Sequence, residues 1–250
     1  MITIPKPNYE VGFKTVRNAH MYTVGSATYP SVTKITGIID KSGALMVWAR
    51  RQSLALAKKE LLEAIKSGVA LTEETLDALL LKADKQPDKV KDDAADLGSR
   101  VHAAIDAHIL GQTSILDEQS RPGYENFTKW LESSGVKMIM GDTAVASIKY
   151  GYGGKLDAIG EKNGQIVLLD WKTSNSFKGR ESYSLQASAY AVAFTETYGI
   201  DVDYAYVVRF GKEIPGDIEV KEVDLCYGFT AFKSALELTK GMKSKLWKGE

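Results

Sequence analysis

Apolar and polar residues follow a helical spacing through most of the first half of the chain. Apolar side chains recur every three to four positions, which is the pattern of helices that bury one face. Ser31 follows Pro30 and is expected to cap a first, short helix. Alternation ahead of it predicts a hairpin that turns at Gly25-Ser26. The longer helices are expected at residues 43–66, from residue 72, at 87–110 and at 124–133.

The pattern changes at Val136, where short alternating or continuously apolar runs replace the helical spacing. We expect a meander of strands, then a helix, two further strands and a closing helix. This order predicts an α+β core with helices on the faces of a sheet. We expect residues 1–134 to form a hairpin and helical part and residues 135–250 to form the core, packed as one compact unit. The predicted strands are 136–139, 143–148, 154–160, 165–171, 202–209 and 218–223, and the helices are 183–198 and 229–246.

Composition excludes some classes of protein. The 250 residues carry a formal net charge of zero, so any nucleic-acid contact must come from local basic patches. The single cysteine, Cys226, excludes an internal disulfide and any four-cysteine zinc or iron–sulfur site. No run approaches the length of a membrane span, and the amino end lacks the apolar core of a signal peptide. We therefore expect a cytoplasmic protein without a membrane partner.

Two acids and a lysine are expected to meet at one edge of the sheet. Asn163-Gly164 is a dipeptide that closes tight hairpins, so the strands on either side of it should pair in antiparallel fashion. That pairing brings Asp157, near the start of one strand, beside Asp170, near the end of the next. Lys172 lies two residues on and shares the face of Asp170. Such a group could hold a divalent metal beside a phosphate. The alternative is a pair of solvated acids with a surface lysine.

A second candidate lies on the helix predicted at residues 87–110. Gly98 and His102 are four positions apart and share one stripe of that helix. Glycine inside a helix costs about 1 kcal/mol relative to alanine, so we expect another part of the chain to approach closely there. On its own, a histidine in this setting is more often half-buried with one satisfied nitrogen than a metal ligand.

Taken together, these motifs resemble the PD-(D/E)xK nuclease superfamily, and within it the RecB-type exonuclease branch. The resemblance rests on Gly98-x3-His102, Gly-x-Leu-Asp157, Asp170-Trp-Lys172-Thr-Ser174 and Gln186-x3-Tyr190, in this order along the chain. The opening Tyr29-Pro-Ser-Val-Thr33 is similar to small phage exonucleases and to mitochondrial genome maintenance exonucleases. The resemblance implies a restriction-endonuclease-like fold, with a central mixed sheet flanked by helices and a helical N-terminal part.

The resemblance also implies roles for individual residues. Asp157 and Asp170 would be catalytic metal ligands, with Lys172 orienting the attacking water and helping to deprotonate it. The Trp171 carbonyl and His102 would be further ligands. Where the family has a glutamate, this chain has Asp142, which is one methylene shorter and puts a second metal position in doubt. The residues implied to contact DNA are Gln186, Tyr190, Ser99, Arg100, Thr173, Ser174 and Tyr152.

The expected cofactor is Mg²⁺ or Mn²⁺, and the imidazole of His102 favours Mn²⁺. The single cysteine argues against an iron–sulfur cluster. The expected function is a metal-dependent exonuclease acting on single-stranded or end-containing DNA, in a bacterium or a phage-infected cell. The alternatives are a flap or junction endonuclease, and a weakly active DNA-binding subunit that serves a helicase or recombination partner in recombination or replication.

Further residues near the predicted site could contact a strand. Basic side chains could line a phosphate groove, although for each one taken singly a solvated surface charge is the more common explanation. Aromatic side chains could stack on unpaired bases, although packing explains Trp171 equally well. The helical half, with Trp48 and Arg50-Arg51, could form a wall of a channel. The basic set is Lys149, Lys155, Lys178, Arg180, Arg209 and Lys212, and the aromatic set is Tyr150, Tyr152 and Trp171.

Overall fold

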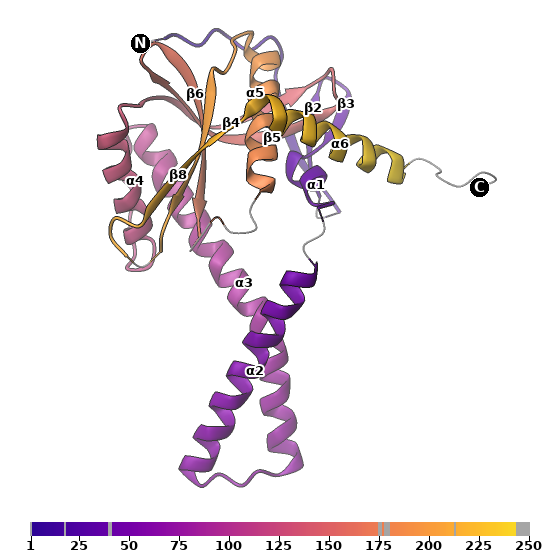
Figure 1. Cartoon of the computed structure of the whole chain (residues 1–250), viewed down its shortest axis with the longest axis vertical. Helices are drawn as coiled ribbons and strands as arrows, with labels where there is room; N and C mark the ends of the chain where they lie inside the picture. The colour runs from indigo at the N-terminus through magenta and orange to yellow at the C-terminus, as the bar shows by residue number, and fades with distance from the viewer. Residues whose placement is uncertain are drawn as a thin grey trace, which may run out of the picture. The chain divides into compact units, whose positions relative to one another are not determined.

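A computed structural model describes residues 2–17, 19–39, 42–174, 177, 181–212 and 214–243. It divides into two compact units, one formed by residues 1–39 and 98–250 and the other by residues 40–97 (Figure 1). The division expected at residue 134 does not coincide with these junctions. No helix among the described residues combines the length and the apolarity that a membrane crossing needs.

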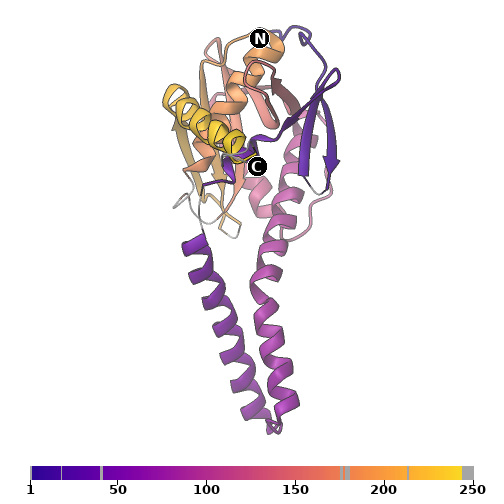
Figure 2. The ribbon, with the colours of Figure 1, turned by 90° about the vertical axis from the view of Figure 1, so that its right-hand side faces the viewer.

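The unit of residues 40–97 is a pair of antiparallel helices, which run side by side in two views (Figures 1 and 2). Helix α2 spans Ser42–Ser67, and α3 spans Glu73–Ile109, so α3 continues into the other unit. The sequence predicted two separate helices here, the second of them starting at Pro87. In the structure α3 is unbroken, and Pro87 lies inside it. Helix α2 has no fully buried residue, and several apolar side chains on it, among them Leu45, Leu54 and Ile65, are exposed.

The other unit begins with a small antiparallel sheet that confirms the expected hairpin. Its strands are β1 (Gly12–Val16), β2 (Ala19–Val24) and β3 (Ala27–Pro30), in the order β1-β2-β3. Gly25 turns the chain between β2 and β3 with φ +56°. Helix α1 (Val32–Thr36) follows, and the Ser31 hydroxyl accepts a hydrogen bond from the Lys34 backbone N–H at 3.1 Å. The predicted cap is confirmed.

A five-stranded mixed sheet forms the centre of this unit and confirms the expected fold class. Neighbouring strands pair in antiparallel fashion except for β6 and β7, which are parallel and are joined through a helix. Asn163 and Gly164 have φ of +54° and +79°, which confirms the predicted tight hairpin between β5 and β6. The sheet order is β4 (Lys137–Ser147), β5 (Tyr152–Lys162), β6 (Gln165–Thr173), β7 (Tyr204–Phe210) and β8 (Ile218–Val223).

Strand β4 replaces two strands that the sequence predicts separately, at residues 136–139 and 143–148. Its register against β5 shifts between Met138 and Met140, and Asp142 has φ +47°. These irregularities bend the strand without ending it, as β-bulges do. The polar Gly141-Asp142 pair therefore marks a distortion within one strand, where the sequence pattern suggested a turn.

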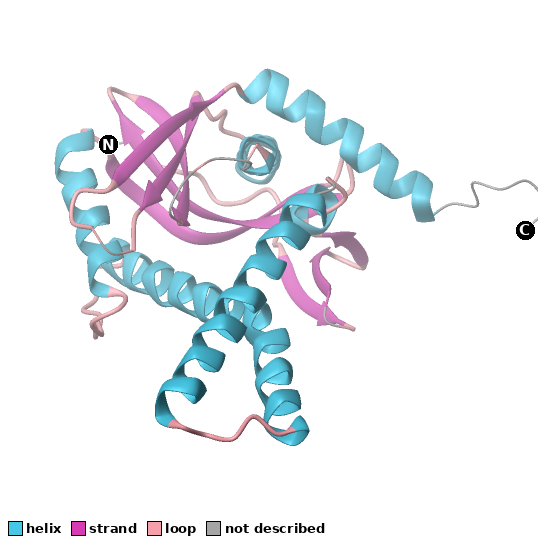
Figure 3. Ribbon diagram, turned by 60° about the horizontal axis from the view of Figure 1, so that its bottom comes forward, coloured by secondary structure: helices cyan, strands magenta, loops and turns pink. Residues whose placement is uncertain are grey.

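Helices cover both faces of the central sheet (Figure 3). Helix α4 (Arg121–Ser134) packs on one face, and α5 (Ser182–Tyr198) packs on the other, with α6 (Leu225–Lys243) against α5. Residues of β6 alternate between these faces. Trp171 is fully buried on the α4 side, where Phe127 and Trp130 hold their ring centres 5.5 and 5.4 Å from its own. The side chains of Asp170 and Lys172 therefore lie on the α5 side.

Candidate active site

The two predicted acids meet across neighbouring strands. Ala158 of β5 pairs with Leu169 of β6, which sets Asp157 beside Asp170 one position along. The backbone N–H of Trp171 donates to Oδ2 of Asp157 at 2.7 Å, which ties that carboxylate to β6. Asp157 lies in the middle of β5 rather than near its start, because β5 continues beyond its pairing with β6 to pair with β4.

Lys172 contacts the buried acid directly. Its Nζ lies 2.5 Å from Oδ2 of Asp170, and Asp170 is 1% exposed. Burial raises the pKa of Asp170 to about 6, against the opposing effect of the lysine and with a contribution from Asp157. Burial would lower the pKa of Lys172, but the charges of Asp170 and Asp157 outweigh it and raise that pKa. The lysine is therefore held as an ammonium ion between two acids.

Helix α3 brings His102 to the same place. Its Nδ1 lies 3.5 Å from Oδ1 of Asp157. Burial alone would lower the pKa of His102, but the Asp157 carboxylate outweighs burial and raises it. Burial would also raise the pKa of Asp157, yet His102 and Lys172 lower it. The expected close approach at Gly98 is confirmed, because a Cβ there would lie 2.9 Å from Oγ1 of Thr173 at the end of β6.

Asp106 is a candidate that the sequence analysis missed. It lies one helical turn beyond His102 on α3, and its Oδ1 would lie 3.5 Å from a Cβ placed on Gly141. Burial raises the pKa of Asp106 to about 6, and the charges of Asp142 and Asp157 raise it further. The signal was present in the sequence, since residues four apart on a helix share a face.

Asp142 lies close to this group, on the irregular part of β4. Its neighbours Gly141 and Thr143 pair with Ala158 and Leu156, the two residues that flank Asp157. Its Oδ1 lies 2.5 Å from Nζ of Lys155, and both side chains are about half exposed. The structure thus brings a fourth acid near Asp157, and its role toward a metal stays a prediction.

The donor chemistry suits a hard divalent cation, although the geometry is not that of a closed metal site. No group of three or more histidine, cysteine, aspartate or glutamate side chains in the described part of the chain is arranged to hold a metal ion. However, Oδ2 of Asp170 is buried against Nζ of Lys172, an ion pair without the geometry of a regular hydrogen bond. Two neighbouring buried carboxylates and an imidazole form a donor set that fits a cation of the Mg²⁺ or Mn²⁺ type.

Two tyrosines proposed for DNA contact are core residues instead. Tyr152 is fully buried, and its hydroxyl donates to the Ala189 carbonyl at 2.9 Å. This position corrects the expectation that Tyr152 contacts DNA, because its ring packs against Phe232 with centres 4.8 Å apart. Tyr190 is 4% exposed, and its hydroxyl accepts a hydrogen bond from Nε2 of Gln186 at 2.9 Å. Gln186 therefore lies at the boundary between the core and the site.

Other proposed contacts are engaged in structural roles. Arg209 is 5% exposed and is paired with Asp217 and Glu219, which corrects its assignment to a phosphate groove. Trp171 is enclosed by α4, so of the two explanations that its sequence position left open, packing in the core holds and stacking on a base does not. Arg100 pairs with Asp117 at 2.5 Å.

The remaining candidates are placed as follows. Ser99 lies on α3, and Thr173 faces Gly98 of the same helix. The Ser174 carbonyl accepts a hydrogen bond from Arg209 at 2.8 Å. Lys149 lies over the Tyr150 ring, 5.2 Å from its centre. Lys178 and Arg180 lie outside the described residues.

Sequence comparison assigns this arrangement to a family. The model of the PD-(D/E)XK nuclease superfamily matches residues 73–226, a stretch that holds α3 from its start, the central sheet and both acids. The chain belongs to the PD-(D/E)XK nuclease superfamily. The predicted resemblance is thereby confirmed, and the match begins on the helix that carries Gly98 and His102.

Individual relatives are more distant. Human mitochondrial genome maintenance exonuclease 1 is 25% identical over 119 residues, which are 46% of this chain and 34% of the human protein. The chain thus spans about a third of that relative's length. A solved structure described as a putative exonuclease from Eubacterium rectale is 13% identical, with a TM-score of 0.44, over 59% of this chain and 67% of that one. An alkaline exonuclease from Laribacter hongkongensis is 13% identical, with a TM-score of 0.28, over 60% of this chain and 86% of that one.

Proposed function

We propose that this chain is a divalent-metal-dependent DNA exonuclease that hydrolyses phosphodiester bonds of single-stranded or end-containing DNA. The observation that carries the proposal is the meeting of Asp157, Asp170, Lys172 and His102 on one face of the central sheet. Membership of a nuclease superfamily supports it. Buried acids with shifted pKa values beside a lysine and a histidine are typical of catalytic sites.

The acids and the histidine would hold the metal. Asp157, Asp170 and His102 offer the donors, and the Trp171 carbonyl and Asp142 are further candidates. When bound, a divalent cation neutralises phosphoryl charge and lowers the pKa of a water molecule that it binds. The hydrogen bond from the Trp171 N–H fixes the orientation of the Asp157 carboxylate, so this donor is positioned before any ligand arrives.

Lys172 would act through its positive charge. Its raised pKa keeps it protonated while it pairs with Asp170, so it cannot accept a proton in this state. An ammonium ion at this position can instead donate hydrogen bonds to a phosphate oxygen or orient an attacking water. Deprotonation of water by Lys172 would require its pKa to fall, which a cation bound between the two acids would promote.

Single-stranded substrates with and without ends test the proposal. Wild-type protein with Mn²⁺ or Mg²⁺ should shorten a linear labelled strand and leave a closed circular strand intact. Lys172→Ala should lower the rate by about 10²–10⁴-fold, and Lys129→Ala, at an exposed position of α4, serves as the matched control. Cleavage of the circle would favour an endonuclease. Equal residual cleavage by wild type and Lys172→Ala would remove the proposed mechanism.

A further inference from the structure

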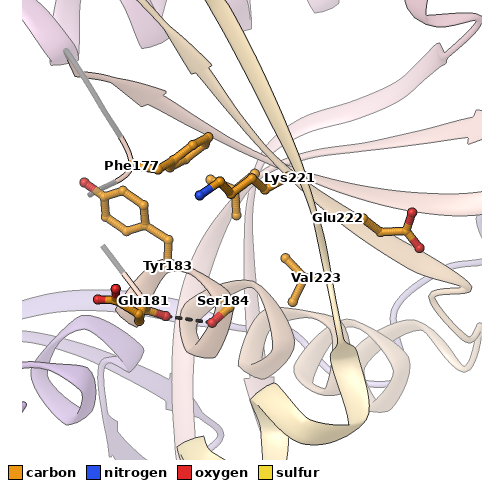
Figure 4. Close-up of a pocket in the computed structure, with 8 residues that line it drawn as sticks. Phe177, Glu181, Tyr183, Ser184, Lys221, Glu222 and Val223 are labelled. Atoms are coloured by element: carbon orange, nitrogen blue, oxygen red, sulfur yellow. Dashed lines mark hydrogen bonds between the residues drawn. The ribbon is translucent and has the colours of Figure 1, made fainter. Parts of the chain in front are cut away.

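A cavity adjoins the candidate active site on the α5 side of the sheet. Its volume is about 210 Å³, and residues from β7, β8 and the first turn of α5 line it together with Phe177 (Figure 4). None of its lining residues was singled out by the sequence motifs. The lining residues are Phe177, Glu181, Tyr183, Ser184, Val207, Lys221, Glu222 and Val223.

The cavity is next to the candidate active site, since residues that line it neighbour Asp170 on the sheet. Asp170, Val207 and Lys221 are in register on β6, β7 and β8, so their side chains form one row on the same face of the sheet. Val207 and Lys221 line the cavity, and Asp170 is the next member of the row. Tyr183 joins the two places, since Nζ of Lys172 lies 4.9 Å from the centre of its ring.

The lining suits a flat apolar group with an anionic neighbour. Phe177 and Tyr183 have ring centres 6.4 Å apart and planes inclined by 72°. Nζ of Lys221 lies 4.9 Å from the centre of the Phe177 ring, and 3.8 Å from Oε1 of Glu219. The Lys221 side chain is 58% exposed, so its charge can reach a ligand at the mouth of the cavity. Glu222 points away from the other labelled side chains (Figure 4).

We propose that this cavity holds the unpaired base of the nucleotide next to the bond that is cut, with Lys221 facing its phosphate. The inference rests on the proposed nuclease function and deepens it. A nucleobase is flat and largely apolar on its faces, and aromatic side chains bind such faces with little dependence on sequence. A paired base cannot enter, because its partner strand blocks the approach. The cavity therefore selects single-stranded DNA at this nucleotide.

Single abasic residues test the inference. A series of linear strands would carry one abasic residue at successive positions from the end, and the rate of cutting each bond would be measured. With the wild-type protein, cutting should slow by about tenfold at the one bond whose neighbouring base would fill the cavity. The binding of intact and abasic strands to Lys172→Ala, measured by fluorescence anisotropy, should show the same preference independently of catalysis.

Two substitutions in the cavity sharpen the test. Val223→Trp fills the cavity and Phe177→Leu removes one ring, so each should abolish the difference between intact and abasic strands. Val220→Trp, on the opposite face of β8, should keep that difference. If Val223→Trp does not fold, Phe177→Leu decides the matter.

The outcomes separate the inference from the function on which it rests. Failure of the wild type to cut any strand would overturn the proposed function. Normal cutting without a position-dependent effect of the abasic residue would overturn only the base-binding cavity. So would an abasic effect that survives in both cavity variants, because the base would then be bound elsewhere.

Discussion

Two clusters of buried charge lie on neighbouring strands of the same sheet, and they differ in how well they are satisfied. Lys172 of β6 is in register with Arg209 of β7, so the clusters are adjacent. The guanidinium of Arg209 donates to Asp217, to Glu219 and to the Ser174 carbonyl. The buried Oδ2 of Asp170, by contrast, has only an irregular ion pair with Lys172 and lies beside a second carboxylate, and the pKa of this acid is raised to about 6.

We interpret the difference as a division of roles, in which the Arg209 cluster supports the fold and the Asp157–Asp170 cluster supports the proposed chemistry. A buried charge that has all its partners is stabilised by its surroundings, and removing it leaves those partners unsatisfied. A buried charge that lacks partners costs stability, so it persists where a ligand or a reaction needs it. The Arg209 cluster is of the first kind. The Asp157–Asp170 cluster is nearer the second, because its two buried acids adjoin each other and burial raises the pKa of Asp170 despite Lys172.

The largest expected effect is the loss of cleavage in Asp170→Asn. The amide keeps the size of the carboxylate but removes its charge, so metal binding and the positioning of Lys172 should both fail. We expect the rate of DNA cleavage with Mn²⁺ to fall by about 10²–10⁴-fold. The matched control is Asp217→Asn in the satisfied cluster, assayed at a temperature where circular dichroism shows both variants folded. Similar losses in the two variants would contradict the division of roles.

Arg209→Met should give the converse result. The substitution removes the guanidinium and leaves Asp217, Glu219 and a backbone carbonyl without their donor. We expect the free energy of unfolding to fall by about 2–3 kcal/mol, less than for a fully enclosed pair because both carboxylates are partly exposed. Urea denaturation would measure this. Cleavage by the folded variant should stay within a few-fold of wild type, and a loss as large as that of Asp170→Asn would refute this prediction.

The sequence predicts the Asp157–Asp170 cluster better than the Arg209 cluster. Asp157, Asp170 and His102 could be placed because the Asn163-Gly164 turn fixes the hairpin and the helical spacing fixes the stripe. Arg209 was misassigned to a phosphate groove, because its partners depend on the pairing of β7 with β8 and on the turn that carries Asp217. Local patterns define a strand, whereas the partners of a charge depend on the folded chain.

The same limit explains the other errors. Tyr152 lies close in sequence to the motif that ends at Asp157, but its ring points into the core. There it packs against Phe232 of α6, a contact that only the folded chain creates. The bend in β4 looked like a turn because Gly141-Asp142 is a polar interruption. Asp106 was overlooked because its proximity to Asp142 and Asp157 arises only when α3 docks against the sheet.

Asp106→Asn should stabilise the metal-free protein near neutral pH. The pKa of Asp106 is raised from 3.8 to about 6, so the folded state holds a proton that the unfolded state loses between these values. The charge of Asp106 therefore destabilises the folded state. This destabilisation is absent below about pH 4 and fully present above about pH 6. After allowance for solvent screening, the gain at pH 7 should be about 1 kcal/mol. Thermal unfolding in the presence of a chelator would measure it.

Asp106→Asn should also be stabilised less than the wild type by a bound divalent cation. A divalent cation at about 100 times its Kd stabilises a folded protein by about 2.7 kcal/mol. Asp106→Asn should gain less from Mn²⁺ if its carboxylate supports the cation. If Asp106→Asn is no more stable than wild type in the presence of a chelator, at pH 7 as at pH 4, then Asp142 and Asp157 do not repel the charge of Asp106.

Lys155→Met should have the smallest effect on the fold and a measurable effect on metal affinity. Lys155 and Asp142 are each about half exposed, so their ion pair is screened by solvent and should contribute less than about 0.5 kcal/mol to stability. Removing the ammonium ion leaves the negative charge of Asp142 uncompensated beside Asp157. A divalent cation should then bind about two- to threefold more tightly, as calorimetric titration with Mn²⁺ would show, and the difference should shrink at high salt. Weaker binding by this variant would mean that Lys155 holds Asp142 in the position that the metal needs. In that case the Lys155–Asp142 pair would have a structural role like that of the Arg209 cluster. The contrast between the two clusters would then apply to Asp170 but not to Asp142.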